Sequence, residues 1–189
     1  ALPIMNIIVF GASGKTGHHL VRQALEQGHS VTAFVRDPAK LTIKHDQLKV
    51  VQGNVSDYST TEEAIKGHEA VLSALGANNP FKYDQVVVDG MGNIIEAMKS
   101  TGVKKLIYLS FVGVKESRKD AGFVISYIAP KLLKAEIAGH EAREKMIRQS
   151  QLDWTIVQAP TLTNGPLKQK YRSGVDLRTK AFIITLSRA

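Results

Sequence analysis

Short apolar runs alternate along the chain with longer segments in which apolar residues recur every three or four positions. Such runs predict buried β-strands, and the periodic segments predict amphipathic α-helices. The expected strands are 5–10, 30–35, 48–52, 69–75, 104–110 and 152–158, and the expected helices are 15–27, 59–66, 84–100 and 131–149. This alternation predicts an α/β fold with a parallel sheet covered by helices on both faces.

Glycines and capping residues divide the chain at the same places. Gly28, Gly67 and Gly102 each follow an expected helix, where a residue without a side chain commonly ends it. Ser59 followed by Glu62 predicts a capping box for the second helix. Right-handed crossovers and a reversal after the first strand then give the strand order 3-2-1-4-5-6, which is a Rossmann-type doubly wound sheet.

The first strand runs directly into the glycine-rich turn GASGKTG and then into the first helix. Gly11 favours a tight turn, Gly14 lets a pyrophosphate approach the backbone amides, and Gly17 lets the helix lie close to its strand. The positive end of that helix then faces the anion. The residues predicted to bind a dinucleotide here are Gly11, Ser13, Gly14, Lys15, Thr16 and Gly17.

Two other interpretations of this turn compete with the dinucleotide site. The GKT tripeptide is found in Walker-type P-loops, but that motif needs a glycine five positions before Gly14, and Val9 stands there inside the strand. An ordinary helix start would leave three glycines at this spacing, directly after a buried strand, without an explanation.

The end of the second strand carries an arginine, Arg36, where an NAD-specific site places a carboxylate for the ribose hydroxyls. A guanidinium fork suits a phosphate instead, and Lys40 or Lys15 can assist it. We therefore predict NADP(H) as the cofactor. The alternative is that Arg36 pairs with Asp37, which is itself a plausible N-cap of the turn beginning at Pro38.

Small and polar residues end the third and fourth strands. Asn54 and Val55 are expected to hydrogen-bond and sandwich an adenine. Ala74, Leu75 and Gly76 are small or lie beside small residues, so they allow a cofactor ribose to approach. Either group can also be an ordinary strand end.

Ser110 ends the fifth strand and is expected beside the nicotinamide. Its hydroxyl can polarise a carbonyl or orient a substrate there, or it can simply cap the strand. Pro160 follows the sixth strand and completes the predicted cofactor-binding set. Segments 77–83, 111–127 and 160–175 are irregular and are expected to build the substrate pocket.

Length and composition narrow the possible classes of protein. The 189 residues predict one domain, 1–189, whose part 160–189 contributes the substrate side. Cysteine is absent, which excludes disulfides and thiol catalysis, and the six histidines show no metal-ligand pattern. No apolar stretch approaches the roughly 20 residues that cross a bilayer, so a cytoplasmic protein without a membrane partner is predicted.

The net charge of +8 comes from basic residues spread along the chain rather than gathered in a run with aromatics. This argues against nucleic-acid binding. A basic surface also attracts a polyanionic dinucleotide, and a solvated basic surface explains the charge equally well. The chain stops at Ala189 soon after an apolar run, and a truncated C-terminus is expected.

Several of these stretches together resemble a known family. The segments IIVFGASGKTGHHLVRQALEQGHSVTAFVRDPAKL, VVQGNVSD, AVLSALG, VKKLIYLS and REKMIRQSQLDWTIVQAP resemble the atypical short-chain dehydrogenases/reductases, in particular the NmrA-like branch and the biliverdin reductase B (flavin reductase) group. The resemblance covers nearly the whole chain. It implies NADPH on a Rossmann fold, used either to reduce flavins or quinones or to sense nucleotide state with little turnover.

The chain departs from that family at its catalytic Tyr-x-x-x-Lys pair. Tyr127 and Lys131 match the pattern, but they lie early relative to the strand LDWTIV, and Pro130 would interrupt a helix that holds both. The family's usual spacing falls on Glu136 and His140 instead.

The residues near this position have open roles. Tyr127 is expected in a loop that shields the nicotinamide pocket, and Ser110 is the better candidate for the catalytic polar group. Glu136, His140 and Glu144 follow one another at four-residue spacing on one helical face, which is either solvated or borders the substrate pocket.

The predicted function is an NADPH-dependent oxidoreductase that transfers hydride to a flavin- or quinone-like acceptor, as a monomer or dimer. The alternative is an NADP(H)-sensing regulator of NmrA type with little or no catalysis. A third hypothesis, a sugar-nucleotide epimerase, is disfavoured by the short C-terminal half and by the misplaced tyrosine.

Overall fold

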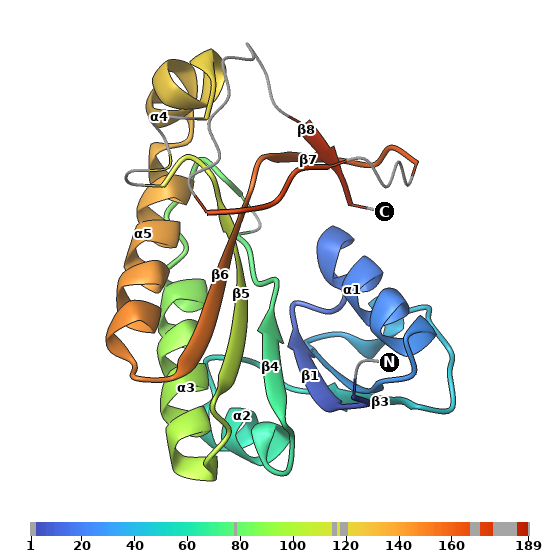
Figure 1. The fold of residues 1–189 in the computed structure, drawn as a ribbon. Helices are drawn as coiled ribbons and strands as arrows, with labels where there is room; N and C mark the ends of the chain where they lie inside the picture. Colours follow the sequence, from blue (N-terminus) through green and yellow to red (C-terminus); the bar gives the residue numbers. More distant parts are fainter. Residues whose placement is uncertain are drawn as a thin grey trace.

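The computed structural model describes residues 3–77, 79–114, 117, 121–166, 171–175 and 185–188. Its main sheet has six parallel strands in the order β3-β2-β1-β4-β5-β6 (Figure 1). They are β1 (Asn6–Phe10), β2 (Ser30–Val35), β3 (Leu48–Gln52), β4 (Ala70–Ser73), β5 (Lys105–Phe111) and β6 (Asp153–Ala159). The predicted Rossmann-type fold and strand order are therefore confirmed.

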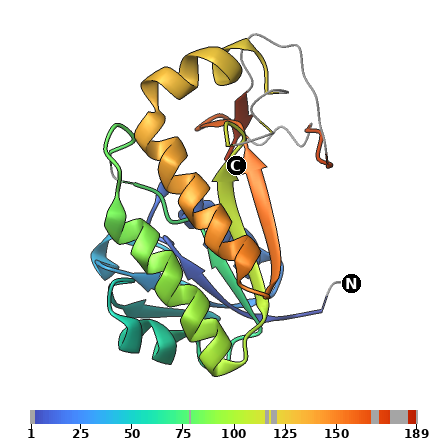
Figure 2. The same cartoon turned by 90° about the vertical axis from the view of Figure 1, so that its left-hand side faces the viewer.

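Helices cover both faces of this sheet. They are α1 (Lys15–Glu26), the 3-10 turn η1 (Pro38–Lys40), α2 (Tyr58–Ile65), α3 (Gln85–Thr101), the π-helical turn η3 (Val124–Ile128), α4 (Ala129–Leu132) and α5 (Lys134–Gln149). Helices α3 and α5 lie on one face and α1 on the other (Figures 1 and 2). Beyond β6, β7 (Thr161–Thr163) pairs with β8 (Thr185–Ser187) in a small second sheet.

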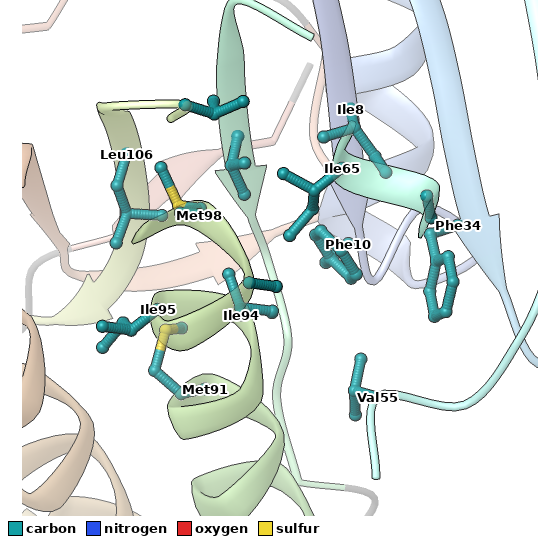
Figure 3. Close-up of a cluster of buried hydrophobic side chains, with 14 of the residues drawn as sticks. Ile8, Phe10, Phe34, Val55, Ile65, Met91, Ile94, Ile95, Met98 and Leu106 are labelled. Atoms are coloured by element: carbon teal, nitrogen blue, oxygen red, sulfur yellow. The ribbon is translucent and has the colours of Figure 1, made fainter. Parts of the chain in front are cut away.

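Successive residues of β1 supply both hydrophobic cores, because side chains alternate between the faces of a strand. Ile8 and Phe10 pack with residues of α2 and α3 in the larger core (Figure 3). Ile7 and Val9 pack under α1, where Val21 meets them. The two cores hold α1 and α3 on opposite faces of the strands that end at the candidate site.

The glycine ends of the helices agree with prediction, but the cap of α2 does not. Gly28, Gly67 and Gly102 have φ of +86°, +79° and +77°, the left-handed conformation that a glycine tolerates. The predicted capping box at Ser59 is wrong. Asp57 is the N-cap, because its carboxylate accepts a hydrogen bond from the backbone N–H of Thr60 at 3.2 Å.

The predicted single helix over 131–149 is also wrong. The chain is already helical in η3 and α4, and α5 starts after a break at Leu133, where φ is −111° and ψ is 31°. Pro130 is the second residue of α4, which follows η3 directly, so the helical turns continue through the proline and the break falls at Leu133. Tyr127 therefore lies in a π-helical turn and not in a loop. In the described part of the chain, no helix has both the length and the hydropathy that crossing a bilayer requires.

Candidate functional site

The turn between β1 and α1 is built from glycines that leave room for neighbouring backbone. Gly11 has φ +77°, and a Cβ there would lie 2.8 Å from the carbonyl group of Ala74. A Cβ on Gly17 would lie 2.0 Å from the carbonyl oxygen of Gly11, so α1 rests directly on the turn. Gly14 is the N-cap of α1, and no side chain caps this end. The first N–H groups of α1 thus remain available to an anion.

A cavity of about 410 Å³ runs along the carboxyl ends of β1, β2, β3 and β4. Its lining includes the predicted residues Gly11, Ser13, Gly14, Arg36, Asn54, Val55, Ala74, Leu75 and Gly76. Lys15, Thr16 and Gly17 in the first turn of α1, Ser110 in β5 and Pro160 after β6 are not among its described lining residues. The cavity thus unites the predicted residues of four strand ends.

The start of α3 forms a wall of this cavity that was not predicted from the sequence. Asp84, Val86 and Val87 line it, and the Asp84 carboxylate caps α3 by accepting a hydrogen bond from the N–H of Val87 at 3.3 Å. An aspartate directly before a helical run is a recognisable N-cap signal. A cap alone does not indicate what the helix end faces, because that depends on how the crossover packs.

Arg36 reaches the cavity from the end of β2, and Lys40 lines the cavity beside it. Within the described residues, the Arg36 guanidinium forms no ion pair. The Asp37 carboxylate instead accepts a hydrogen bond from the N–H of Ala39 at 3.1 Å and lies 3.8 Å from Lys40 Nζ. The predicted N-cap role of Asp37 is confirmed, and its carboxylate is engaged away from Arg36.

The residues after β3 are held in place by α3. The Asn54 side-chain oxygen accepts a hydrogen bond from the N–H of Ser56 at 3.2 Å. The Asn93 amide donates to the carbonyl oxygen of Val55 at 2.8 Å, and a Cβ on Gly90 would lie 2.5 Å from the Val55 side chain. Helix α3 therefore packs closely against Val55. Asn93 is a supporting residue that the strand-end pattern could not reveal, because it lies far along the chain.

Ser110 lies at the end of β5, but its hydroxyl is turned toward α5. It is 4% exposed and donates a hydrogen bond to Glu144 Oε1 at 2.6 Å. The same oxygen accepts a hydrogen bond from the Gln158 amide at 2.9 Å, and Arg148 lies 3.3 Å from the other carboxylate oxygen. His140 Nδ1 is 3.4 Å from the Ser110 hydroxyl. Ser110 is thus part of a buried polar network between the sheet and α5.

The histidine of this network has two partners. The Tyr108 hydroxyl oxygen lies 2.7 Å from His140 Nδ1, and His140 Nε2 lies 3.2 Å from Glu136 Oε1. Burial lowers the pKa of His140, although the Glu136 carboxylate works in the opposite direction. Burial also raises the pKa of Tyr108, which stays protonated. A neutral His140 with its proton on Nε2 satisfies both contacts.

Glu136 is ionised in this arrangement. Burial alone would raise its pKa, but the hydrogen bond from His140 and the charge of Arg143 outweigh burial and lower it. The sequence left open whether Glu136 and His140 lie on a solvated face or border the substrate pocket. In the structure both side chains are mostly buried, and they face each other and the end of the sheet.

Tyr127 is not brought to the cavity. Its side chain is 65% exposed, and its ring centroid lies 5.2 Å from that of Phe123. Lys131, the second member of the literal Tyr-x-x-x-Lys match, lies in α4. Over the described ranges, no group of three or more histidine, aspartate or glutamate side chains is arranged to hold a metal ion.

A glycine turn under a helix start, a cleft across the strand ends and a cationic rim define a dinucleotide-binding protein. The model of the NAD(P)H-binding family matches residues 11–188, and the chain belongs to that family. The predicted dinucleotide cofactor is therefore confirmed as NAD(P)H. The expected membership of an NAD(P)-binding family is confirmed with it.

One curated relative is similar to most of this chain. The photosystem II assembly factor Ycf39 of Synechocystis sp. is 30% identical over 168 residues, which cover 87% of this chain and 47% of Ycf39. The chain thus spans about half the length of that relative.

Solved structures share the fold. A short-chain dehydrogenase/reductase of Veillonella parvula in complex with NADP has a TM-score of 0.79 at 20% identity, covering 98% of this chain and 82% of that one. ChuY, an anaerobilin reductase of Escherichia coli O157:H7, has a TM-score of 0.78 at 20% identity, covering 97% of this chain and 84% of that one.

Proposed function

We propose that this protein is an NADPH-dependent oxidoreductase that transfers hydride to a flavin- or quinone-like acceptor. The observation that carries the proposal is the guanidinium of Arg36, which lines the cavity together with Lys40 and forms no ion pair with any described residue. A guanidinium fork binds a phosphate through charge-assisted hydrogen bonds, whereas a carboxylate here would repel one. The carboxylate in the described lining, Asp84, is engaged as the cap of α3.

The described residues suit the nucleotide in two further respects. The uncapped start of α1 supplies N–H groups for a pyrophosphate, and Gly14 adds no side chain where the phosphate would lie. Val55, fixed by Asn93, offers an apolar surface for a base. In this proposal Arg36, Lys40, Gly14 and Val55 bind the adenosine and phosphate half of the cofactor, and Ala74 to Gly76 border the other half.

The acceptor class follows from how little acid catalysis the site offers. Bound NADPH would supply the hydride, which with one proton from water completes the two-electron reduction of a flat ring. Position and exclusion of water are then the main contributions of the protein. Tyr127 is exposed and stacks on Phe123, which suits a shielding role better than proton transfer.

We keep Ser110 as the proposed catalytic polar group and give Tyr127 a lesser role. Ser110 stands on the rigid end of β5, and its hydroxyl is within reach of both Glu144 and His140. These two partners can hold or pass a proton at the serine oxygen.

The direction in which the Ser110 hydroxyl points also favours a second function, that of an NADP(H) sensor. The Ser110 hydroxyl donates its hydrogen to Glu144 in the protein interior and is therefore not directed at a ligand in the cavity. A protein that binds NADP(H) and reports its presence to a partner needs no hydroxyl directed at a ligand. Ycf39 is described as an assembly factor, which is consistent with a nucleotide-binding protein of this kind.

One assay separates the two functions. NADPH and NADH oxidation is followed with FMN, riboflavin and a panel of quinones, beside direct titration of both nucleotides. The reductase proposal expects turnover with NADPH on at least one ring acceptor, a slower rate in Ser110→Ala and a nearly normal rate in Tyr127→Phe. Tight NADPH binding without any turnover would favour the sensor. Loss of activity in Tyr127→Phe alone would overturn the role given to Ser110.

The location, partners, oligomeric state and domain organisation of the protein are also proposed. We propose a cytoplasmic protein whose partner is a small molecule, acting as a monomer or dimer and without nucleic acid. We also propose that 1–189 form one domain with 160–189 on the substrate side. Much of that last segment lies outside the described residues.

A further inference from the structure

Arg143 is a buried cation whose role is not explained by the nucleotide cleft or by the acceptor chemistry. It lies in α5, on the face of the sheet that also carries α3 (Figure 2), and its side chain is 2% exposed. Its Nε donates to the carbonyl oxygen of Gly139 at 3.0 Å, and its Nη1 donates to that of Leu75 at 2.8 Å. Its guanidinium carbon lies 5.6 Å from the centroid of the Tyr108 ring.

These partners are unusual for a buried arginine. In the described part of the chain, no carboxylate lies within ion-pair distance of Arg143. A buried charge is costly unless hydrogen bonds and nearby charges compensate it. Here two backbone carbonyls and an aromatic face do so directly, and one of those carbonyls belongs to the wall of the cavity.

At Leu75 the cavity wall has passed the end of strand β4. Strand β4 ends at Ser73, and the N–H of Ala74 donates to the carbonyl oxygen of Phe10 at 3.0 Å. Beyond Ala74, the bond from Arg143 is what fixes the Leu75 carbonyl. Ala74 in turn touches the glycine turn, since a Cβ on Gly11 would lie 2.8 Å from its carbonyl group.

We propose that Arg143 is a positioning residue that sets the wall at Leu75 for the nicotinamide half of the nucleotide. This rests on the proposed function, in which Arg36 holds the adenosine half at the ends of β2 and β3. In a dinucleotide bound across the switch point of a Rossmann sheet, the two halves lie on opposite sides of the first strand. The half opposite Arg36 therefore meets the end of β4, which α5 controls through Arg143.

The test compares two ligands that differ in the half they occupy. Dissociation constants of NADPH and of adenosine 2′,5′-bisphosphate are measured for wild type, Arg143→Lys and Arg143→Met under conditions where each is folded. In Arg143→Met the NADPH constant should rise about tenfold, which is about 1.4 kcal/mol, because NADPH must then order the released Leu75 wall as it binds. The fragment constant should not change. Arg143→Lys should recover part of the loss, because an ammonium can reach one carbonyl but not both.

Lys145→Met is the control. It removes an exposed cation from the same helix, and Lys145 forms no ion pair with any described residue. Both ligands should bind it as they bind wild type. Equal losses for both ligands in the Arg143 variants, or no loss in either, would overturn the proposal. Failure of wild type to bind either ligand would instead overturn the proposed function.

If the variants do not fold, a hydrogen-exchange measurement on the wild-type protein tests the same proposal. Hydrogen exchange is followed with NADPH and with the fragment. NADPH should slow exchange in 139–147 of α5 more than the fragment does, because ordering the Leu75 wall also orders its anchor. Equal protection by the two ligands would contradict the proposal.

Discussion

Arg36 shows how much a single side chain decides in this cleft. Its neighbour Asp37 carries the opposite charge, yet the Asp37 carboxylate is committed to the N–H of Ala39 and lies near Lys40. The guanidinium is exposed at the cavity rim and unpaired among the described residues. We therefore propose that the choice between NADPH and NADH depends on Arg36, whose competing partner Asp37 is engaged elsewhere.

Replacing Arg36 with alanine should weaken NADPH binding and spare NADH. A charge-assisted hydrogen bond contributes about 1.5–3 kcal/mol, so the NADPH dissociation constant should rise roughly tenfold or more. The measurement is a titration of both nucleotides against Arg36→Ala and wild type. Arg22→Ala serves as the control, because Arg22 is a surface arginine of α1 paired with Glu26. If both nucleotides lose affinity equally, Arg36 has a structural role.

At the scale of elements, the contact between α1 and the glycine turn places the anion-binding end. Gly17 lies in the first turn of α1, directly over the carbonyl oxygen of Gly11. The helix approaches its strand this closely only without a Cβ at that position. Gly92, in the middle of α3, is different, since the nearest atom to a Cβ there is Met146 Sδ at 3.9 Å.

Gly17→Ala should therefore destabilise the protein and weaken NADPH binding together. Its Cβ would lie 2.0 Å from backbone, and overpacking of this kind costs on the order of 1–3 kcal/mol. Gly92→Ala should be neutral or stabilising by up to about 1 kcal/mol, because alanine is the better helix former and has room. Urea unfolding and nucleotide titration of both variants provide the comparison. A stable Gly17→Ala with normal affinity would show that α1 can move without cost.

At the scale of the whole molecule, a buried polar layer joins α5 to the sheet beside two hydrophobic cores. Glu136, Glu144, Arg143 and Tyr108 all face His140 in this layer. Burial disfavours the protonated imidazole, and the nearby Arg143 adds to that effect, so the pKa of His140 lies below its usual 6.5. Protonation of His140 is therefore expected to weaken the packing of α5 on the sheet.

The free energy of unfolding should fall as the pH drops below about 6.5. The unfolded chain then binds a proton that folded His140 resists, so stability is complete above the unfolded pKa and is lost toward the lowered folded pKa. Glu136 acts in a lower window, because its lowered pKa starts from 4.5. His140→Asn should reduce the change between pH 7 and 5.5 in urea titrations, and the remainder is expected from His68, whose pKa burial also lowers. His45→Asn, an exposed histidine, should leave the change intact, and an equal slope in both variants would refute the role of His140.

Much of this architecture is readable along the chain because it rests on local signals. Glycines at Gly11, Gly14 and Gly17 and the alternation of apolar runs with helical periods predict the nucleotide turn, the parallel sheet and its order. Arg36 could also be placed at the cleft, because the end of a strand is itself a sequence feature. The helix break before Lys134 could not be predicted, because the sequence does not show whether the helical turns stop at Pro130 or continue through it to Leu133.

The sequence by itself determined the fold class, the glycine turn and the residues at the strand ends, because each depends on neighbours within a few positions. Only the tertiary structure decided what those ends face. Ser110 could be assigned to the end of β5, but its bond to Glu144 requires α5 to pack there. Arg143 reaches Leu75 across 68 positions of chain. Contacts of such separation depend on how helices pack onto the sheet, which no local pattern records.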